Sequence, residues 1–509
     1  MLIFGSSAST LGRIELACPL LLFGSLAPHQ LRPAISNVIS IIYTVMSNAP
    51  FHSSQPFVAF RNAAFAALLA TGLNALLGCG GNEPGQLGHD AAVTVDAPSA
   101  LDAELNCPAG AAGAGCVLAL YARTQSSCAA SDVSQLTIEL NARRSLGPLW
   151  FNGSALFRSD APRAVAGDFN AWSTTALPTA RLCTSDLFLA RGAVAIGYWQ
   201  YKIVDNTATG AAAWQLDVYN PGFAFDAFTG NADGKNSVLN TAGSRRGHLV
   251  DLGALSSTSL GNTRRLTGYL PPDYNAPSNA TRTYPTLFMH DGQNVFDDTT
   301  CCFGHTGWEI NVALDREIAA GRVGPTIVVA ADHAGANRNS EYGWAVSAGG
   351  KIETFVEFFV NGIVPRAAQL VRVDASKRFV AGSSLGGLIS MRIALAHPDM
   401  FAGAGSFSGA FWPGHDTQTA LRDLLPRVGK KQFGIYLDHG GTVAAGGDGL
   451  MDSVEIRDQL VALGWNRTNS PQCTLGGDAL CYYHEPGATH DELAWRDRVW
   501  RMLVYFFPA

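Results

Sequence analysis

A serine in a glycine-rich turn is the residue of this chain best suited to do chemistry. Ser384 is the central residue of Gly382-Ser383-Ser384-Leu385-Gly386, a G-x-S-x-G motif. An apolar run typical of a strand precedes the motif, and an amphipathic helical pattern follows it at once. This context exposes a serine at the apex of a sharp turn, where it can act as a nucleophile. We predict that role for Ser384; a glycine-rich helix start without chemistry is the alternative.

A nucleophilic serine needs a neighbouring base, because its hydroxyl is weakly nucleophilic on its own. His490 lies in the segment PGATHDE, between a predicted strand that ends near His484 and the last predicted helix. His397 precedes a proline at a predicted helix end, and His439 follows a strand of the buried type. We therefore predict that His490 is the base, with His397 as a helix cap and His439 as a supporting residue.

The base needs an acid that fixes its tautomer and stabilises its charged form. The predicted strand 433–438 ends in a long, glycine-rich segment that offers Asp438, Asp448 and Asp452. Asp438 stands at the strand end, where it could hold the loop instead. We favour Asp448 and keep the other two open.

The negative charge that develops on a carbonyl oxygen requires two backbone N–H donors. The residue after the nucleophile, Leu385, supplies one of them. The other is predicted from Gln293, in the loop LFMHDGQN that follows an early strand. Asp291 in this loop is predicted to contact substrate; its alternative role is to anchor the turn.

The elements that position these residues are predicted from about residue 253 onward. Strand-like and helix-like stretches alternate to the C-terminus, which predicts an α/β domain over 253–509 with a mostly parallel sheet. Sites in such sheets lie at the carboxyl ends of the strands, where each motif above falls.

The preceding segment, 107–252, is strand-like. Residues 136–140 and 198–204 alternate in polarity, and turn-forming clusters separate such runs. Short strands at this spacing predict a β-sandwich domain.

The first hundred residues differ in kind. Residues 57–79 hold an arginine, an apolar run and Leu76-Leu77-Gly78-Cys79, which resembles a signal peptide ending in a lipidated cysteine; a buried apolar helix is the alternative. We predict that 1–79 comprises an extension from a mis-assigned start followed by this signal, and that 80–106 is a flexible linker.

Composition narrows the function classes. The chain has 509 residues and a net charge of −6, which gives no electrostatic footprint for nucleic acid. Besides Cys18 and Cys79 it has eight cysteines, an even number that suggests disulfides in an exported chain. Cys473 and Cys481 are the most plausible local pair, and the vicinal Cys301 and Cys302 stay unassigned. No cysteine spacing typical of zinc is present, so a structural metal is not expected. The serine chemistry described above requires no metal or organic cofactor either.

Ordered motifs in the last 245 residues resemble the serine esterase family of the α/β-hydrolase fold, which groups enterochelin esterases, feruloyl esterases, formylglutathione hydrolases and mycolyltransferases. The matching segments are YLPPDY (269–274), LFMHDGQNVFDD (287–298), TGWEI (306–310), NRNSEY (337–342), AGSSLGG (381–387), SFSGAFW (406–412) and PGATHDELAW (486–495). The resemblance implies a triad of Ser384, Asp448 and His490, with Gln293 and Leu385 as oxyanion donors. It also implies that Arg338 and Glu341 brace the site and that Phe411 and Trp412 border the substrate pocket. The long acid segment and the vicinal cysteines depart from the family pattern.

The segments VAGDFNAWS (165–173), YWQYKIVDN (198–206), WQLDVYNP (214–221) and GKNSVLN (234–240) resemble the early-set, immunoglobulin-like modules related to glycogen-binding domains. Such a module usually shapes the neighbouring cleft, and sugar stacking on its tryptophans is a second interpretation.

Together these features predict an exported serine carboxylic ester hydrolase that forms an acyl-enzyme. Its expected substrate is a small-molecule ester or an ester linked to a polysaccharide or a phenolic compound. We expect contact with the membrane only through a lipid anchor at Cys79, in a periplasmic or cell-surface outer-membrane lipoprotein. An acyltransferase of the mycolyltransferase type and a non-catalytic carbohydrate-binding lipoprotein are the alternatives.

Overall fold

The computed structural model describes residues 107–109, 113–144, 146–226, 234–298, 301–302, 306–343, 350–413, 420–442 and 447–509. The predicted signal, Cys79 and the linker 80–106 lie outside these residues. The chain divides into units 1–99 and 100–509, and every described residue belongs to the second. In the described part of the chain, no helix has both the length and the apolar composition needed to cross a membrane.

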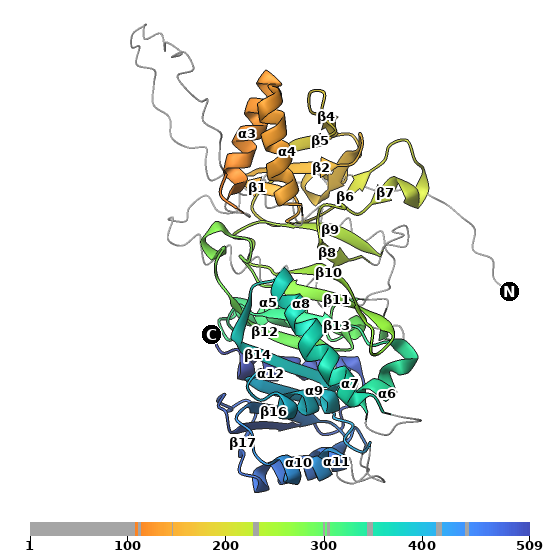
Figure 1. The fold of residues 1–509 in the computed structure, drawn as a ribbon, viewed down its shortest axis with the longest axis vertical. Coiled ribbons are helices and arrows are strands. Elements are labelled where there is room, and N and C mark those ends of the chain that lie inside the picture. Colours follow the sequence, from red (N-terminus) through yellow and green to blue (C-terminus); the bar gives the residue numbers. More distant parts are fainter. Residues whose placement is uncertain are drawn as a thin grey trace, which may run out of the picture. The chain divides into compact units, whose positions relative to one another are not determined.

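The C-terminal part is an α/β-hydrolase fold built on a twisted sheet (Figure 1). The parallel strands lie in the order β17-β18-β16-β15-β14-β12-β13, and β11 pairs antiparallel with β13. The strands are β11 (Asn262–Leu270), β12 (Tyr284–His290), β13 (Ile327–Ala331), β14 (Val373–Ser383), β15 (Gly403–Phe407), β16 (Gly434–His439), β17 (Asn466–Asn469) and β18 (Ala479–His484). Several are buried along nearly their whole length, as expected for a sheet covered on both faces.

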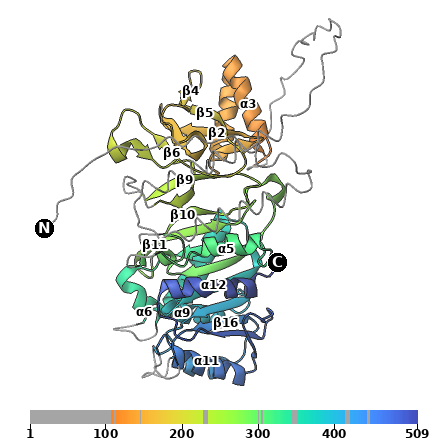
Figure 2. The ribbon, with the colours of Figure 1, turned by 180° about the vertical axis from the view of Figure 1, so that it is seen from behind.

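Helices cover both faces of this sheet, and each face has its own apolar core. The helices are α5 (Ile310–Ala319), α6 (Arg338–Tyr342), α7 (Ile352–Phe358), α8 (Val364–Leu370), α9 (Leu385–Ala396), α10 (Leu421–Val428), α11 (Leu450–Ala462) and α12 (Glu492–Phe506). One core joins residues of α7, α8, α9, α10 and α11 to the sheet. The other joins α5 and α12 to the opposite face, which Figure 2 shows from that side. A π-helical turn (Phe359–Ile363) separates α7 from α8.

The N-terminal part contains strands of two sheets that share an apolar cluster. One consists of β1 (Leu149–Phe151), β2 (Ser154–Ser159), β4 (Ala180–Arg181) and β5 (Phe188–Ala193). The other contains β3 (Ala164–Gly167), β6 (Tyr198–Val204), β7 (Trp214–Gln215), β8 (Gly222–Phe225) and β9 (Lys235–Asn240). Phe157 of the first sheet meets Tyr201 of the second edge to face, with ring centroids 5.3 Å apart, in a shared apolar cluster. The relation of this part to immunoglobulin-like modules stays a prediction.

The prediction of strand structure over 136–140 is wrong. This segment belongs to α4 (Ala130–Ala142), which follows α3 (Ala114–Ser127). Leu136 and Leu140 are buried on one side of α4, at the helical spacing of four residues. They pack with residues of α3 and of β1, β2 and β5 in one apolar cluster. The predicted sandwich domain therefore begins with a helical pair.

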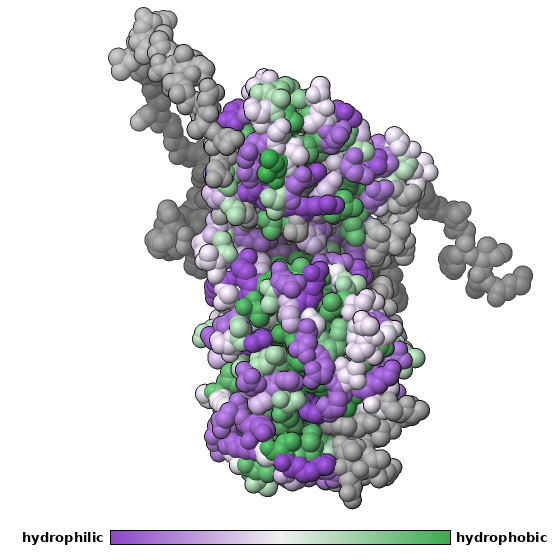
Figure 3. All heavy atoms as spheres, viewed as in Figure 1, coloured by the Kyte–Doolittle hydropathy of each residue, from purple (hydrophilic) through white to green (hydrophobic). Residues whose placement is uncertain are grey.

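One sheet runs through both parts of the described chain. Strand β10 (His248–Ser257) pairs with β8 on one edge and with β11 on the other, so the sheet continues from the hydrolase strands to β3. The predicted boundary between residues 252 and 253 falls inside β10. On the face shown in Figure 3, hydrophobic and hydrophilic residues are intermixed over both parts.

Four disulfides join the eight described cysteines. The predicted pair Cys473–Cys481 is confirmed, and the vicinal cysteines 301 and 302 are bonded to each other. The remaining pairs are Cys107–Cys116 and Cys128–Cys183, both in the N-terminal part.

Candidate active site

Ser384 stands in the turn between β14 and α9. Its backbone has φ 54° and ψ −124°, a strained conformation for a residue with a side chain. The turn is tight because a Cβ on Gly382 would lie 2.8 Å from the carbonyl carbon of Gly386, so only glycine fits there. Helix α9 starts at Leu385, immediately after the turn. The Ser384 side chain is therefore held at the carboxyl end of the sheet, as the motif predicts.

Ser384 is also tied to the next strand. Its N–H donates to the carbonyl of Phe407 at the end of β15 (2.9 Å), and its carbonyl accepts from the N–H of Ala410 (3.0 Å). Two backbone hydrogen bonds thus fix the turn against the segment that follows β15.

The two predicted oxyanion donors lie at helix starts. Leu385 is the first residue of α9, and Gln293 is in the single 3-10 turn Gly292–Asn294 after β12. N–H groups in the first turn of a helix lack an acceptor within the helix and are available to a ligand. The two segments are neighbours, because a Cβ on Gly386 would lie 3.1 Å from Asp291 Oδ2.

The Asp291 carboxylate is engaged within the protein. Arg338 Nε and Nη2 donate to its two oxygens at 2.7 and 2.8 Å, a bidentate ion pair. Asp291 also has a positive φ of 57° at the start of the 3-10 turn. This geometry favours the alternative role, in which Asp291 anchors the oxyanion loop and Arg338 braces it. Glu341 instead pairs with the buried Arg264.

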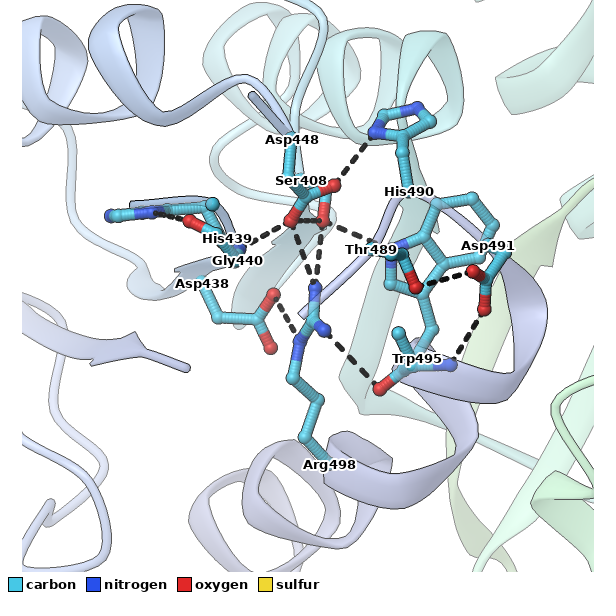
Figure 4. A network of polar contacts seen from close by, with 12 residues as sticks. Ser408, Asp438, His439, Gly440, Asp448, Thr489, His490, Asp491, Trp495 and Arg498 are labelled. Atoms are coloured by element: carbon cyan, nitrogen blue, oxygen red, sulfur yellow. Dashed lines mark hydrogen bonds and ion pairs between the residues drawn. The ribbon is translucent and has the colours of Figure 1, made fainter. Parts of the chain in front are cut away.

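His490 and Asp448 are brought together although 42 residues separate them. His490 Nδ1 lies 2.8 Å from Asp448 Oδ1 (Figure 4). The Asp448 side chain is 1 % exposed and that of His490 is 43 % exposed, so a buried acid supports a base open to solvent. The imidazole also packs edge-on against Trp495, with ring centroids 5.2 Å apart. Among the described residues, no hydrogen bond links Ser384 Oγ to His490; such contacts commonly tighten only in the substrate complex.

The other oxygen of Asp448 has three donors around it. Ser408 Oγ lies 2.7 Å away, the N–H of Gly440 also bonds to Oδ2, and Arg498 Nη2 lies at 3.5 Å. Asp448 therefore presents Oδ1 alone to His490.

The remaining predicted acids lie elsewhere. Asp438 is fully buried at the end of β16 and accepts a hydrogen bond from Tyr436 Oη at 2.8 Å. Burial raises the pKa of Asp438 to about 6, against the attraction of Arg498, whose Nε lies 3.1 Å from Asp438 Oδ1. Asp452 lies in the first turn of α11. Asp448 is the aspartate that contacts His490.

His439 is in the supporting position predicted for it. His439 is buried. Its Nε2 lies 2.6 Å from Tyr482 Oη, and its Nδ1 lies 3.0 Å from the Gly440 carbonyl oxygen. Burial lowers the pKa of His439 to about 4, so the ring is neutral at pH 7. It stacks on His484 with ring centroids 4.7 Å apart.

Two aromatic residues were predicted to border the substrate pocket. Phe411 is 1 % exposed and belongs to the apolar core, whereas Trp412 is 52 % exposed. Only Trp412 offers open surface to a ligand. His397 follows the last residue of α9, as predicted from its proline neighbour.

Sequence reasoning missed the roles of Ser408, Trp495 and Arg498. Ser408 and Trp495 stand inside motifs of the family resemblance, but no spacing rule connects them to Asp448. Arg498 lies on α12, which begins after His490, and no sequence pattern connects it to Asp448.

The chain is similar to several known proteins. Residues 257–506 match the model of the Esterase family, described as "Putative esterase". An uncharacterized protein of Bacillus subtilis (strain 168), YbbA, is 29 % identical over 200 residues, which cover 37 % of this chain and 73 % of YbbA.

Similar solved structures include a ferulic acid esterase with 18 % identity and a TM-score of 0.37, over 52 % of this chain and 98 % of the other. The enterobactin esterase FES from Shigella flexneri, solved in the presence of enterobactin, has 15 % identity and a TM-score of 0.40, over 71 % and 95 % of the two chains.

Proposed function

We propose that the chain works through an acyl-enzyme on Ser384. Residues 257–506, just under half of the chain, match the Esterase family, which supports a carboxylic ester hydrolase of the α/β-hydrolase fold. The observation that carries this proposal is the strained turn at Ser384 together with the Asp448–His490 hydrogen bond. Both are features that a serine hydrolase needs and that packing alone does not require.

In the proposed acylation step, Ser384 Oγ attacks the ester carbonyl carbon and His490 Nε2 takes the hydroxyl proton. Nδ1–H of His490 stays bonded to Asp448, which stabilises the imidazolium. The N–H groups of Leu385 and Gln293 stabilise the oxyanion. The tetrahedral intermediate collapses, the bond to the alcohol oxygen breaks, and His490 returns the proton to the departing alcohol.

Deacylation repeats these steps with water. His490 takes a proton from water, the resulting hydroxide adds to the acyl carbon, and the bond to Ser384 Oγ breaks as the proton returns to it. The carboxylic acid is released and the enzyme is restored.

We propose that the protein acts after export and is anchored by lipid at Cys79. The four disulfides support an oxidising compartment. The expected substrate is an ester on a polysaccharide or a phenolic compound, and the exposed indole of Trp412 is a surface on which a planar or sugar ring could stack.

The test is an assay of the purified chain with p-nitrophenyl acetate, butyrate and octanoate and with methyl ferulate, beside Ser384→Ala. Activity that disappears in the variant supports the proposal, and the preferred ester separates short acyl chains from phenolic substrates. A fluorophosphonate probe should add to Ser384 of the wild-type protein and leave the variant unmodified. Equal activity in both folded proteins would overturn the assignment.

A further inference from the structure

A buried guanidinium lies behind the proposed acid. Arg498 projects from α12, its side chain is 2 % exposed, and its groups reach two carboxylates and a hydroxyl (Figure 4). Nε lies 3.1 Å from Asp438 Oδ1, while Nη2 lies 3.5 Å from Asp448 Oδ2 and donates to Ser408 Oγ at 2.7 Å. Nη1 donates to the Ala494 carbonyl at 3.2 Å.

The charges in this cluster do not balance without Arg498. Asp438 and Asp448 are 0 % and 1 % exposed, so neither carboxylate is solvated by bulk water. Two buried carboxylates near one another cannot both stay ionised unless a cation compensates them. Arg498 is the buried cation in contact with both.

Arg498 also decides where the proton of Ser408 points. Ser408 Oγ accepts one hydrogen bond from Arg498 and another from the indole N–H of Trp495 at 2.9 Å. A hydroxyl has a single hydrogen, and with both acceptor positions taken this hydrogen is directed to Asp448 Oδ2. Oδ2 is then occupied, and Oδ1 is left for His490.

We propose that Arg498 is a positioning residue of the hydrolytic site: it keeps Asp448 ionised and aimed at His490, and Asp438 anchors its other end. This inference rests on the proposed function of Ser384, His490 and Asp448. Arg498 touches neither substrate nor reacting atoms, and it acts through Asp448.

Other titratable and charged groups face this cluster from each packed element. They are Tyr436 and His439 on β16, His484 on β18, His490 and Asp491 before α12, and Arg501 on α12. The buried His439 is neutral at pH 7, so it does not replace the charge of Arg498.

The test is a double-substitution cycle on the full chain. Arg498→Met keeps most of the side-chain volume and removes the charge, so one carboxylate of the pair takes up a proton. At pH 7 we expect kcat to fall about 10-fold to 100-fold with KM nearly constant, and the acidic limb of the pH profile to move to higher pH.

Removing the second carboxylate is the matched rescue. In Arg498→Met with Asp438→Asn, Asp448 is the one remaining buried carboxylate of the cluster, and we expect kcat to recover roughly 5-fold or more over the single variant. Arg498→Lys, which keeps the charge and loses the fork of donors, should retain the position of the acidic limb while kcat falls.

Each outcome has a consequence. A wild-type profile in Arg498→Met, or a double variant no better than Arg498→Met, would overturn the role of Arg498. If near-UV circular dichroism shows that Arg498→Met does not fold, Arg498→Lys and the double variant decide. A wild-type kcat in Arg498→Lys, or an acidic limb of the pH profile that is shifted in the double variant, then counts against the inference. Activity that survives Ser384→Ala would overturn the proposed function and this inference together, whereas Ser384-dependent activity that ignores Arg498 overturns this inference alone.

Discussion

The N–H of Ser384 donates to the carbonyl of Phe407 at 2.9 Å, and this bond joins the nucleophile to the residue that precedes Ser408. Ser408 in turn bonds to Asp448, which bonds to His490. The proposed triad therefore shares a frame made by the segment after β15. Its members do not depend on the loops alone for their positions.

The first prediction concerns Ser408. Ser408→Ala removes a donor to Asp448 Oδ2 and the shared acceptor of Trp495 and Arg498, so Asp448 gains freedom to turn. We expect kcat to fall about 10-fold, the size of one lost hydrogen bond to a charged group, with KM nearly unchanged. Ser406→Ala is the matched control, since Ser406 Oγ is buried two residues away and has no hydrogen-bond partner among the described residues. Equal kinetics for the two variants would refute the prediction.

The second prediction separates the candidate acids. Asp448→Asn cannot fix the histidine tautomer or stabilise the imidazolium, and kcat should fall on the order of 10³- to 10⁴-fold. Asp452→Asn should stay within about 2-fold, because asparagine keeps the shape of this half-buried side chain in the first turn of α11. Steady-state kinetics on one p-nitrophenyl ester compares both. A larger loss for Asp452→Asn would move the acid to α11.

The α/β domain could be predicted from the sequence because its signals are local and redundant. Strand β14, the turn at Ser384 and α9 follow one another directly in the sequence. The hydrophobic periodicity of the flanking segments and the glycines of the turn all predict the same strand–turn–helix. The strand prediction for residues 136–140 is wrong because the same five residues fit two patterns. Their alternating polarity is typical of a strand, while the four-residue spacing of Leu136 and Leu140 also fits a helix. Burial of these two leucines against α3 and the β1–β2–β5 sheet, a tertiary effect, decides for the helix.

The candidate site could be predicted for residues whose role is tied to a local sequence motif. Ser384 and His490 have motif contexts, and the resemblance favoured Asp448. The charge balance between Asp438, Asp448 and Arg498 has no sequence signature, because the three side chains meet only when β16, the acid loop and α12 are folded.

The third prediction concerns acid stability. Burial lowers the pKa of His248, His290 and His439 to about 4, 3 and 4. The unfolded chain binds these protons near pH 6.5 and the folded one does not. Their contribution is therefore fully present above pH 6.5 and is lost as pH falls toward the folded values. The free energy of unfolding should decrease over that window.

A variant isolates this effect, because Asp217, Asp332 and Asp438 have pKa values that burial raises to about 6, and they act in the opposite sense. His290 has no hydrogen-bond partner among the described residues and packs against aromatic rings. We expect the free energy of unfolding of His290→Phe, measured in urea relative to wild type, to be roughly 2 kcal/mol higher at pH 5 than at pH 8. A constant difference in unfolding free energy between variant and wild type across this range would contradict the lowered pKa of His290.

The fourth prediction concerns the buried ion pair of Arg264 and Glu341, with side chains 0 % and 1 % exposed. Glu341 also accepts from Asn262 Nδ2 at 2.6 Å. Glu341→Ala leaves the guanidinium buried without its counter-ion and should cost about 3–5 kcal/mol of unfolding free energy. Glu353→Ala breaks the pair with Arg392, in which Glu353 is 58 % exposed, and should cost about 1 kcal/mol or less. Similar losses in denaturant titrations would show that Glu341 is not held as a charge.

The fifth prediction ranks two disulfides by the chain they enclose. Cys128–Cys183 has a sequence separation of 55 and ties the end of α3 to the loop before β5, whereas Cys473–Cys481 has a separation of 8. Because closing a longer loop removes more entropy from the unfolded chain, replacing the first pair by alanines should cost about 4 kcal/mol and the second about 2.5 kcal/mol. Calorimetry of the two double variants gives the order. Ester hydrolysis at 25 °C should survive the loss of Cys128–Cys183, since no residue of the proposed triad lies in the segment it closes. Equal losses would contradict this ranking. Activity that is lost while the protein stays folded would instead mean that the N-terminal part contributes to the site itself.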